Sequence, residues 1–334
     1  MDAEMKLGVW APLPHTIGRE AEIDLALEEL GQPGRGLPVD RSYAFLRDVV
    51  KRAEEIGFDI TLVAERLVAR DLEAWVVASA LAVETSRIEI MTAVHPGIFP
   101  PQLVAKMAAS LDRLSGGRVC LNMVPGRRSH EFALYGNNGW IDDSEARYRR
   151  VDEFLRVVKG LWRKEAFTLN GQFFNVQDAT VATKPFQKTI PIYAASGAPL
   201  GQEIIARECD LWFASYEPGH ENYERNLAFM RADIKAMRER AARHGRQIGI
   251  GVSTHVTLAP SLDEAKTEAR KIEADPASAV AAKSLGAGLI GPPELVAERI
   301  RLYEEIGVTC LMLQFHPMRD GMERFAREVL PLIR

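Results

Sequence analysis

The sequence is poor in the residues that build disulfides and metal sites. It contains three cysteines and seven histidines in 334 residues. Cys120, Cys209 and Cys310 are far apart, and each lies in an apolar, strand-like context. Because disulfide frameworks and zinc sites need suitably spaced ligands, we expect reduced core thiols, a cytoplasmic protein and no bound metal.

Long apolar runs and a strong charge of one sign are missing as well. No apolar run approaches the roughly 18 residues that suggest a membrane-spanning helix, and the first residues lack the charged-then-apolar pattern of a signal peptide. The formal net charge is only -4. We therefore expect a soluble protein with neither a membrane nor a nucleic acid as partner.

A glycine-rich phosphate-binding turn is missing from the position where a dinucleotide-binding fold would carry it. The first expected strand, residues 7–10, is followed by Ala11-Pro12-Leu13-Pro14 rather than by a G-x-G-x-x-G turn. The sequence also shows no low-complexity segment and no internal repeat. These absences weigh against an open, doubly wound sheet that binds a nicotinamide cofactor.

The chain does contain a regular alternation of short apolar runs and longer amphipathic segments. Apolar residues recur at helical spacing in segments such as 43–56 and 100–114. The expected strands lie at 7–10, 59–63, 88–93, 119–124, 191–194, 211–214, 249–258 and 309–314. Strands that alternate with helices form parallel sheets, and eight such pairs at this length favour a closed TIM (β/α)8 barrel with loop insertions.

We expect residues 1–334 to form a single domain whose insertions lie at about 11–40, 125–142 and 166–185. Two β-prone runs flank Asn170-Gly171 in the third insertion, which is typical of a hairpin. Residues 274–292 are rich in Ala, Gly, Ser and Pro, so we expect a mobile loop there that is a candidate lid.

The most informative stretch runs from Ser115 to Arg128. A Ser-Gly-Gly turn leads into the apolar strand 119–124, which carries one polar residue, Asn122, and a cluster with Arg127 and Glu131 follows. A buried strand with an amide near its carboxyl end is typical of a barrel that presents a polar group to a ligand. The alternative is an ordinary strand followed by a solvated, charged loop.

Several segments together resemble the luciferase-like flavin monooxygenases, a family of barrel enzymes. The resemblance runs from Lys6 to the end of the chain. Its most specific pieces are AKMAASLDRLSGGR at 105–118, NMVPG at 122–126, ARYRRVDEF at 146–154 and EVLPL at 328–332. It implies a bacterial luciferase-like barrel, similar to the two-component enzymes that act on alkanesulfonates, dimethyl sulfone or pyrimidines.

The resemblance implies a monooxygenase that depends on FMNH2 and O2. The substrate would be a small organosulfur or N-heterocyclic compound, oxidised through a peroxyflavin. A separate NAD(P)H:flavin reductase would supply the reduced FMN, and the family habit implies a homo-oligomer, a dimer or a tetramer. The protein itself would bind and orient the reactants and exclude water.

The resemblance also assigns residues to the cofactor. They are Ala64, Glu65, Ala93, Asn122, Glu131, Arg147, Tyr148, Ser196 and Gly197. Arg147 and Tyr148 start a helix, where free backbone N–H groups and the helix dipole attract anions. The usual phosphate-binding turn is altered here to Ala195-Ser196-Gly197-Ala198, which still offers backbone amides to a phosphate.

His255, His316 and Arg127 are the candidate catalytic residues on the substrate side. His255 aligns with a pocket histidine of the alkanesulfonate enzymes, whose arginine two residues earlier is Ser253 here and whose tyrosine near the last strand is His316. Because a sulfonate favours bidentate cations, these replacements argue against a simple alkanesulfonate. Arg127 would supply replacement charge, unless its loop is simply solvated.

Two other functions stay open. An F420-dependent oxidoreductase of the same fold would transfer a hydride without oxygen, although the Arg147-Tyr148 pair and the hairpin favour FMN. A non-catalytic flavin-binding barrel is the second alternative. Such barrels tend to be truncated, whereas eight β/α pairs are expected here.

Overall fold

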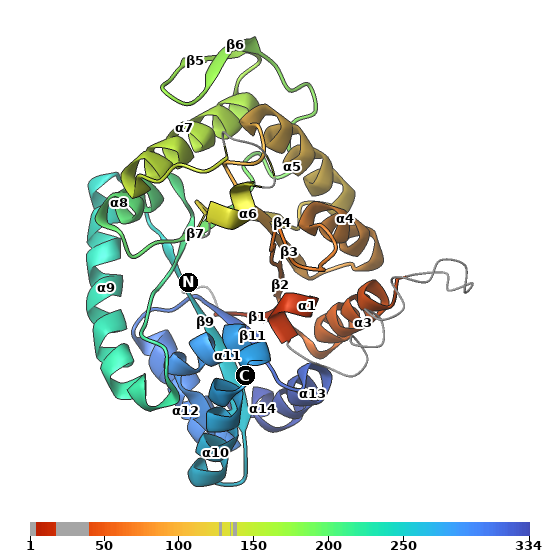
Figure 1. Cartoon of the computed structure of the whole chain (residues 1–334), viewed down its shortest axis with the longest axis vertical. Coiled ribbons are helices and arrows are strands. Elements are labelled where there is room, and N and C mark those ends of the chain that lie inside the picture. The colour runs from red at the N-terminus through yellow and green to blue at the C-terminus, as the bar shows by residue number, and fades with distance from the viewer. Residues whose placement is uncertain (1–4, 18–39, 127–128, 134, 136–138) are drawn as a thin grey trace.

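Eight parallel strands close into a barrel that a ring of helices surrounds (Figure 1). The computed structural model describes residues 5–17, 40–126, 129–133, 135 and 139–334. The barrel strands are β1 (Lys6–Trp10), β2 (Ile60–Val63), β3 (Glu89–Val94), β4 (Val119–Met123), β7 (Ile192–Ala195), β8 (Leu211–Phe213), β9 (Gly249–Leu258) and β11 (Cys310–Gln314). Each pairs with the next in this order, and β11 pairs with β1. The expected (β/α)8 barrel is therefore confirmed.

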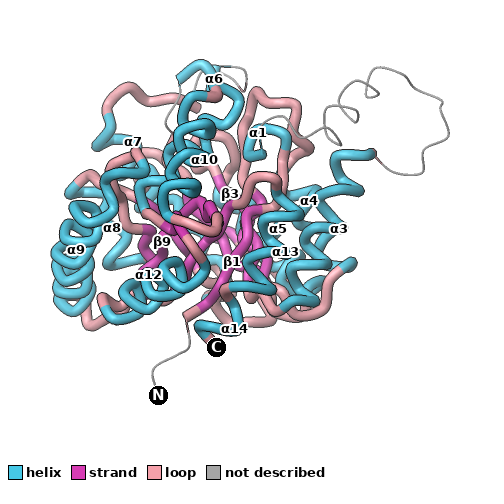
Figure 2. The backbone as a smooth tube through the Cα atoms, turned by 90° about the horizontal axis from the view of Figure 1, so that it is seen from below, coloured by secondary structure: helices cyan, strands magenta, loops and turns pink. Residues whose placement is uncertain are grey.

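Helices cover the outside of the barrel. The longer ones are α3 (Arg41–Ile56), α4 (Ala74–Glu84), α5 (Pro101–Ser115), α7 (Ser144–Arg163), α8 (Pro199–Glu208), α9 (Tyr223–Arg243), α10 (Leu262–Ala274), α12 (Pro293–Glu305) and α13 (Met318–Glu328). Shorter ones are α1 (Pro14–Ile17), α6 (Ser129–Ala133), α11 (Ala279–Ser284) and α14 (Leu330–Ile333). Figure 2 shows α1 and α6 at one end of the barrel and α14 at the other.

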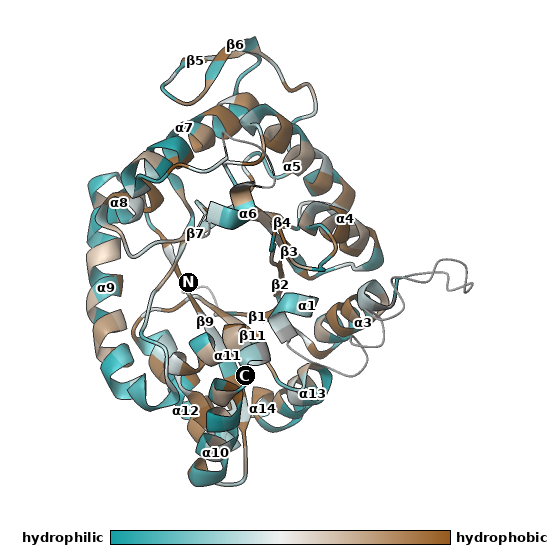
Figure 3. Cartoon of the chain, viewed as in Figure 1, coloured by the Kyte–Doolittle hydropathy of each residue, from teal (hydrophilic) through white to brown (hydrophobic). Residues whose placement is uncertain are grey.

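Local sequence signals set where these helices begin and end. The Asp40 side chain caps α3 by accepting a hydrogen bond of 3.0 Å from Tyr43 N, and Gly57 ends the helix with a φ of 96°. α5 begins with Pro101, where proline costs no hydrogen bond. Apolar residues, brown in Figure 3, line the strands and the inner sides of α5 and α7.

The third expected insertion contains the expected hairpin. β5 (Phe167–Asn170) and β6 (Asn175–Ala179) pair antiparallel outside the barrel (Figure 1). The first insertion lies largely outside the described residues. Among the residues that are described, none of the helices is both long and apolar enough to span a bilayer.

The structure corrects the loop predicted at 274–292. This stretch forms the 3₁₀ turns η2 (Pro276–Ser278) and η3 (Leu285–Ala287), helix α11, and strand β10 (Leu289–Gly291), which pairs with residues 256–258 of β9. Leu285 and Ala287 are fully buried. Packing against the barrel therefore stabilises short elements that composition alone does not favour. Whether the stretch moves as a lid stays a prediction.

Candidate active site

Alternate residues of the strands face the barrel interior. A Cβ added at Gly8 would meet Met312 Sδ at 2.2 Å and Ile60 Cγ2 at 2.7 Å, so these side chains point inward. A Cβ added at Gly251 would lie 2.5 Å from Phe213 Cδ1, so Phe213 points inward too. Because paired residues of parallel strands point to the same side, the register identifies the remaining inward residues.

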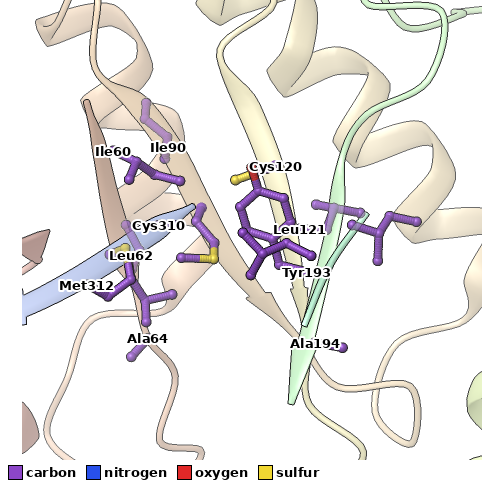
Figure 4. Close-up of a cluster of buried hydrophobic side chains, with 14 of the residues drawn as sticks. Ile60, Leu62, Ala64, Ile90, Cys120, Leu121, Tyr193, Ala194, Cys310 and Met312 are labelled. Atoms are coloured by element: carbon purple, nitrogen blue, oxygen red, sulfur yellow. The ribbon is translucent and has the colours of Figure 1, made fainter. Parts of the chain in front are cut away.

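The middle of the interior is solidly packed. Leu62, Cys120, Tyr193, Cys310 and Met312 meet there from β2, β4, β7 and β11 (Figure 4). All three cysteines are buried and unpaired, which confirms the expected core thiols. Burial raises the pKa of the Cys310 thiol to about 12, so this layer offers no reactive thiolate.

The interior opens at the carboxyl ends of the strands. In four strands an inward-facing residue near that end is partly or fully exposed although its strand neighbours are buried: Trp10, Asn122, Ala195 and Phe213. Ser253, midway along β9, is partly exposed as well. Trp10 Nε1 donates a hydrogen bond of 3.0 Å to Ser253 Oγ across the interior, because β11 lies between their strands. We call this opening the mouth. Barrel enzymes carry their active sites at this end.

Three expected cofactor residues lie side by side on one wall of the mouth. Asn122 of β4 pairs in register with Ala93 of β3 on one side and with Tyr193 of β7 on the other. The register of β2 and β3, extended by one step, places Ala64 beside Ala93. Two methyl side chains next to a partly exposed amide form a flat surface with one polar group.

The segments above this wall hold partly or fully buried ionisable side chains. Glu65 turns away from the strand, and its Oε2 accepts a hydrogen bond of 2.8 Å from Ala74 N at the start of α4. Burial raises the pKa of Glu65 to about 7, against the opposing effect of that N–H. Glu131 of α6 is buried and forms an ion pair of 2.8 Å with Arg66, which sequence reasoning missed.

His95 lies beside this ion pair, just after β3. Its ring packs edge-on against Phe132, with a centroid separation of 6.0 Å. Burial lowers the pKa of His95 to about 4, and the nearby Glu131 carboxylate opposes that shift. Neither ring nitrogen has a hydrogen-bond partner among the described residues. The imidazole is therefore neutral near pH 7.

A second group of expected cofactor residues meets at the end of β7. Tyr148 of α7 and Ser196 join their hydroxyl groups at 2.8 Å, and Ser196 Oγ accepts a hydrogen bond of 3.0 Å from Ala198 N. Gly201 packs so close that a Cβ there would lie 2.2 Å from Ser196 Oγ. Gly197 is exposed, so its backbone is open to a ligand.

Arg147 points elsewhere. Its guanidinium stacks over the Trp140 ring at 4.4 Å from the centroid and donates to the carbonyl oxygens of Ile141 and Asp142, the latter at 2.9 Å. It thus fixes the segment before α7 in this structure. The role of Arg147 in binding the cofactor stays a prediction, and Arg127 lies outside the described residues.

The opposite wall of the mouth carries His255 and a residue that sequence reasoning missed, Gln314. The two are register partners on β9 and β11, with exposed fractions of 1% and 4%. His255 Nε2 and both amide atoms of Gln314 lack a hydrogen-bond partner among the described residues. Burial, reinforced by nearby His316, lowers the pKa of His255 to about 3.

A signal for Gln314 exists in the sequence. It is the one polar residue at the carboxyl end of an apolar strand, CLMLQ, just as Asn122 is in VCLNM. His316 is exposed and lines a separate cavity of about 570 Å³ between α10 and α13. Lys271 in that cavity pairs with Glu268 at 2.7 Å. No group of three or more potential metal ligands occurs in the described part of the chain.

Comparison with known proteins identifies the family. Residues 5–310 match the family described as luciferase-like monooxygenases. The chain belongs to this family. Membership confirms the predicted family and the predicted class of enzyme, a monooxygenase.

Individual proteins of named activity are similar to this chain over most of its length. An FMNH2-dependent dimethylsulfone monooxygenase of Pseudomonas putida is 29% identical over 326 residues, which cover 86% of this chain and 87% of that protein. The solved EDTA monooxygenase from Chelativorans sp. BNC1 superposes with a TM-score of 0.77 at 20% identity, over 99% of this chain and 93% of the other.

An F420-dependent secondary alcohol dehydrogenase, in complex with an F420-acetone adduct, superposes with a TM-score of 0.71 at 18% identity, over 99% of each chain. At such identities a structural likeness shows the fold alone. The same barrel therefore occurs in a monooxygenase and in an F420-dependent dehydrogenase, and the fold alone does not identify the cofactor.

Proposed function

We propose that this protein is an FMNH2-dependent monooxygenase that oxidises a small, uncharged organosulfur or N-heterocyclic compound at the mouth of its barrel. The observation that carries the proposal is the arrangement around the mouth. A flat wall of Ala64, Ala93 and Asn122 stands on one side, and the Tyr148–Ser196 pair lies beside it. Opposite stand buried polar groups that have no hydrogen-bond partner in the described part of the chain.

The residues present fit reduced FMN. A flavin ring needs a flat, largely apolar wall with few polar groups, which Ala64, Ala93 and Asn122 offer. A phosphate needs hydroxyl and backbone N–H donors, which Ser196, Tyr148 and the turn before α8 offer. The FMNH2-dependent relative in P. putida supports the choice of cofactor. When bound, reduced FMN would supply the electrons that activate O2.

The protein's own residues would then bind, orient and exclude water. Asn122 would hold a polar edge of the ring, and the Arg66–Glu131 ion pair would keep α6 over the wall of the mouth. His95 and His255, both uncharged near neutral pH, would offer hydrogen bonds without attracting an anion. An uncharged substrate therefore suits the mouth better than a sulfonate, which needs cations.

A separate reductase is part of the proposal. Dependence of the relative on FMNH2 supports an external source of reduced flavin. The second alternative, a non-catalytic barrel, is disfavoured because all eight barrel strands are present. A homo-oligomer stays a prediction.

An anaerobic titration tests the function. The protein is titrated with reduced FMN, oxidised FMN, and oxidised and reduced F420, and then exposed to O2. We expect selective binding of reduced FMN and a flavin absorbance change on adding O2. Selective binding of F420 without an oxygen-dependent change would move the protein to hydride transfer. Binding of neither cofactor would overturn both enzymatic functions.

A further inference from the structure

Gln314 is the most unusual polar residue of the barrel interior. It ends β11, faces the barrel interior in register with His255, and is 4% exposed. Both its amide oxygen and its amide nitrogen lack partners among the described residues. A buried primary amide with neither atom satisfied is costly, so such a group normally has a partner in the protein's working state.

The surroundings limit what that partner can be. Trp10 Nε1 is already bonded to Ser253 Oγ, so it does not compete for the Gln314 amide. His255 Nδ1 lies 3.5 Å from Thr257 Oγ1, and His255 Nε2 has no hydrogen-bond partner among the described residues. Trp10, Ser253 and Thr257, the polar groups named here beside His255, carry no charge. A charged ligand would find no counterion among them, whereas a neutral one would need none.

The two polar atoms of the Gln314 amide need different hydrogen-bond partners. Gln314 Nε2 donates hydrogen bonds and Gln314 Oε1 accepts them, and the two atoms sit side by side in one plane. A ligand that satisfies both presents an acceptor next to a donor, as in the pairing of glutamine with an adenine edge. A cis-amide edge, with C=O beside N–H, has this pattern. A sulfone has acceptor oxygens alone and would leave Oε1 buried without a partner.

We propose that Gln314, assisted by His255, is a specificity-determining residue that reads the cis-amide edge of the substrate, as found in a lactam, cyclic urea or cyclic imide. The proposal rests on the proposed function and selects the N-heterocyclic branch of it. Gln314 would hold the substrate edge by two parallel hydrogen bonds, and no covalent step is assigned to it.

Matched small ligands test the subsite without any turnover. 2-Pyrrolidone carries C=O beside N–H, N-methyl-2-pyrrolidone has lost the donor, and dimethyl sulfone has acceptors alone. Binding of each to the full-length protein is measured by calorimetry and by the shift of the unfolding midpoint, with and without oxidised FMN. We expect 2-pyrrolidone to bind at least tenfold more tightly than the other two. Equal binding, or preference for dimethyl sulfone, would overturn the proposal.

A pair of glutamine variants separates recognition from structure. Gln314→Met keeps the size of the side chain and removes both polar atoms, so we expect it to abolish discrimination between the two pyrrolidones while the unfolding midpoint stays the same or rises. Gln187 is the control, because its amide nitrogen donates to Asp112 Oδ1 at 2.6 Å and to Val119 O at 2.9 Å. Gln187→Met should lower the midpoint and keep the discrimination.

Other results would count against the subsite. If Gln314→Met lowered the midpoint as Gln187→Met does, the amide would be structural. If Gln314→Met weakened the binding of reduced FMN and left the affinity for the pyrrolidones unchanged, the amide would bind the isoalloxazine edge instead. Failure of the proposed function is distinguishable, because wild type would then discriminate between the pyrrolidones and bind no reduced FMN.

Discussion

The two ends of the barrel use their polar side chains in opposite ways. At the amino ends, charged groups saturate the backbone: Glu54 accepts from the N–H groups of Ser86, Arg87 and Ile88. At the carboxyl ends, His95, His255 and Gln314 keep polar atoms without partners among the described residues. Strand β3 carries both patterns, with Ile88 just before it and His95 just after it.

This difference indicates that the amino ends of the strands contribute mainly to stability and the carboxyl ends mainly to function. Satisfied polar groups at the amino ends fix the turns between helices and strands, which stabilises the barrel. Unsatisfied groups at the carboxyl ends cost free energy in the absence of a ligand, and local violations of this kind are expected at functional sites. If stability and function are separated in this way, a substitution at one end should leave the property of the other end unchanged.

The largest effect is expected from Arg118→Met at the amino end. The Arg118 guanidinium donates to the carbonyl oxygens of Ser115, Ile88, Ala82 and Thr85 and to the Thr85 hydroxyl, all within 3.0 Å. Removing it strips several acceptors at once, so we expect a loss of about 3 kcal/mol in the free energy of unfolding, measured with urea.

The control for that variant is Arg149→Met. Arg149 is exposed and its guanidinium pairs with Asp143 and Glu145 at 3.2 and 3.4 Å. Exposed pairs contribute little, so we expect a change within about 0.5 kcal/mol. Equal losses in the two variants would contradict the view that the amino end is where polar satisfaction stabilises the barrel.

A smaller effect, dependent on pH, is expected from Glu65→Gln at the mouth. Burial raises the pKa of Glu65 from 4.5 to about 7, so the folded protein keeps a proton that the unfolded chain releases between these values. Wild-type stability from this group therefore falls as the pH rises from about 4.5 to about 7. The full shift corresponds to about 3.4 kcal/mol, and solvent screening of this partly exposed carboxyl lowers it. The Glu65→Gln variant should therefore be more stable than wild type by about 2 kcal/mol at pH 8 and equal to it at pH 4.

Urea unfolding across that pH range checks this prediction. Glu65→Ala is the companion variant, because it also removes the acceptor of the Ala74 N–H at the start of α4. It should therefore be less stable than Glu65→Gln at every pH. If the free energy of unfolding depended on pH in the same way in the wild type and in Glu65→Gln, burial would not raise the pKa of Glu65.

Two glycine variants compare the mouth with the packed middle of the barrel. A Cβ at Gly201 would lie 2.2 Å from Ser196 Oγ and 2.5 Å from Tyr148 Cε1, so Gly201→Ala should separate the two hydroxyl groups. We expect the affinity for reduced FMN to fall about tenfold, which corresponds to about 1.4 kcal/mol. Gly8→Ala crowds Met312 instead and should lower stability by about 1 kcal/mol without changing FMN affinity. Calorimetry and urea unfolding measure both. The reverse pattern would place the phosphate site elsewhere.

Much of the barrel was predictable because each of its elements has a local signature. Alternating periodicities indicated strands and helices, and a lone amide at the end of an apolar strand marked Asn122. The same rule would have found Gln314. The Arg66–Glu131 pair joins residues 65 positions apart in sequence, and Trp140 turns Arg147 away. Such contacts depend on tertiary packing, which periodicity does not report.

The smallest effect is expected from Tyr148→Phe, which removes one hydroxyl at the mouth. Its bond of 2.8 Å to Ser196 Oγ is partly exposed, so we expect the free energy of unfolding to fall by about 0.5 kcal/mol. If the pair holds the phosphate, affinity for reduced FMN should fall about threefold. Ser196→Ala and the double variant complete a double-mutant cycle on FMN binding, measured by calorimetry. Strict additivity in that cycle would show that the two hydroxyls do not act as one anion-binding unit, and would leave the turn's backbone amides to hold the phosphate.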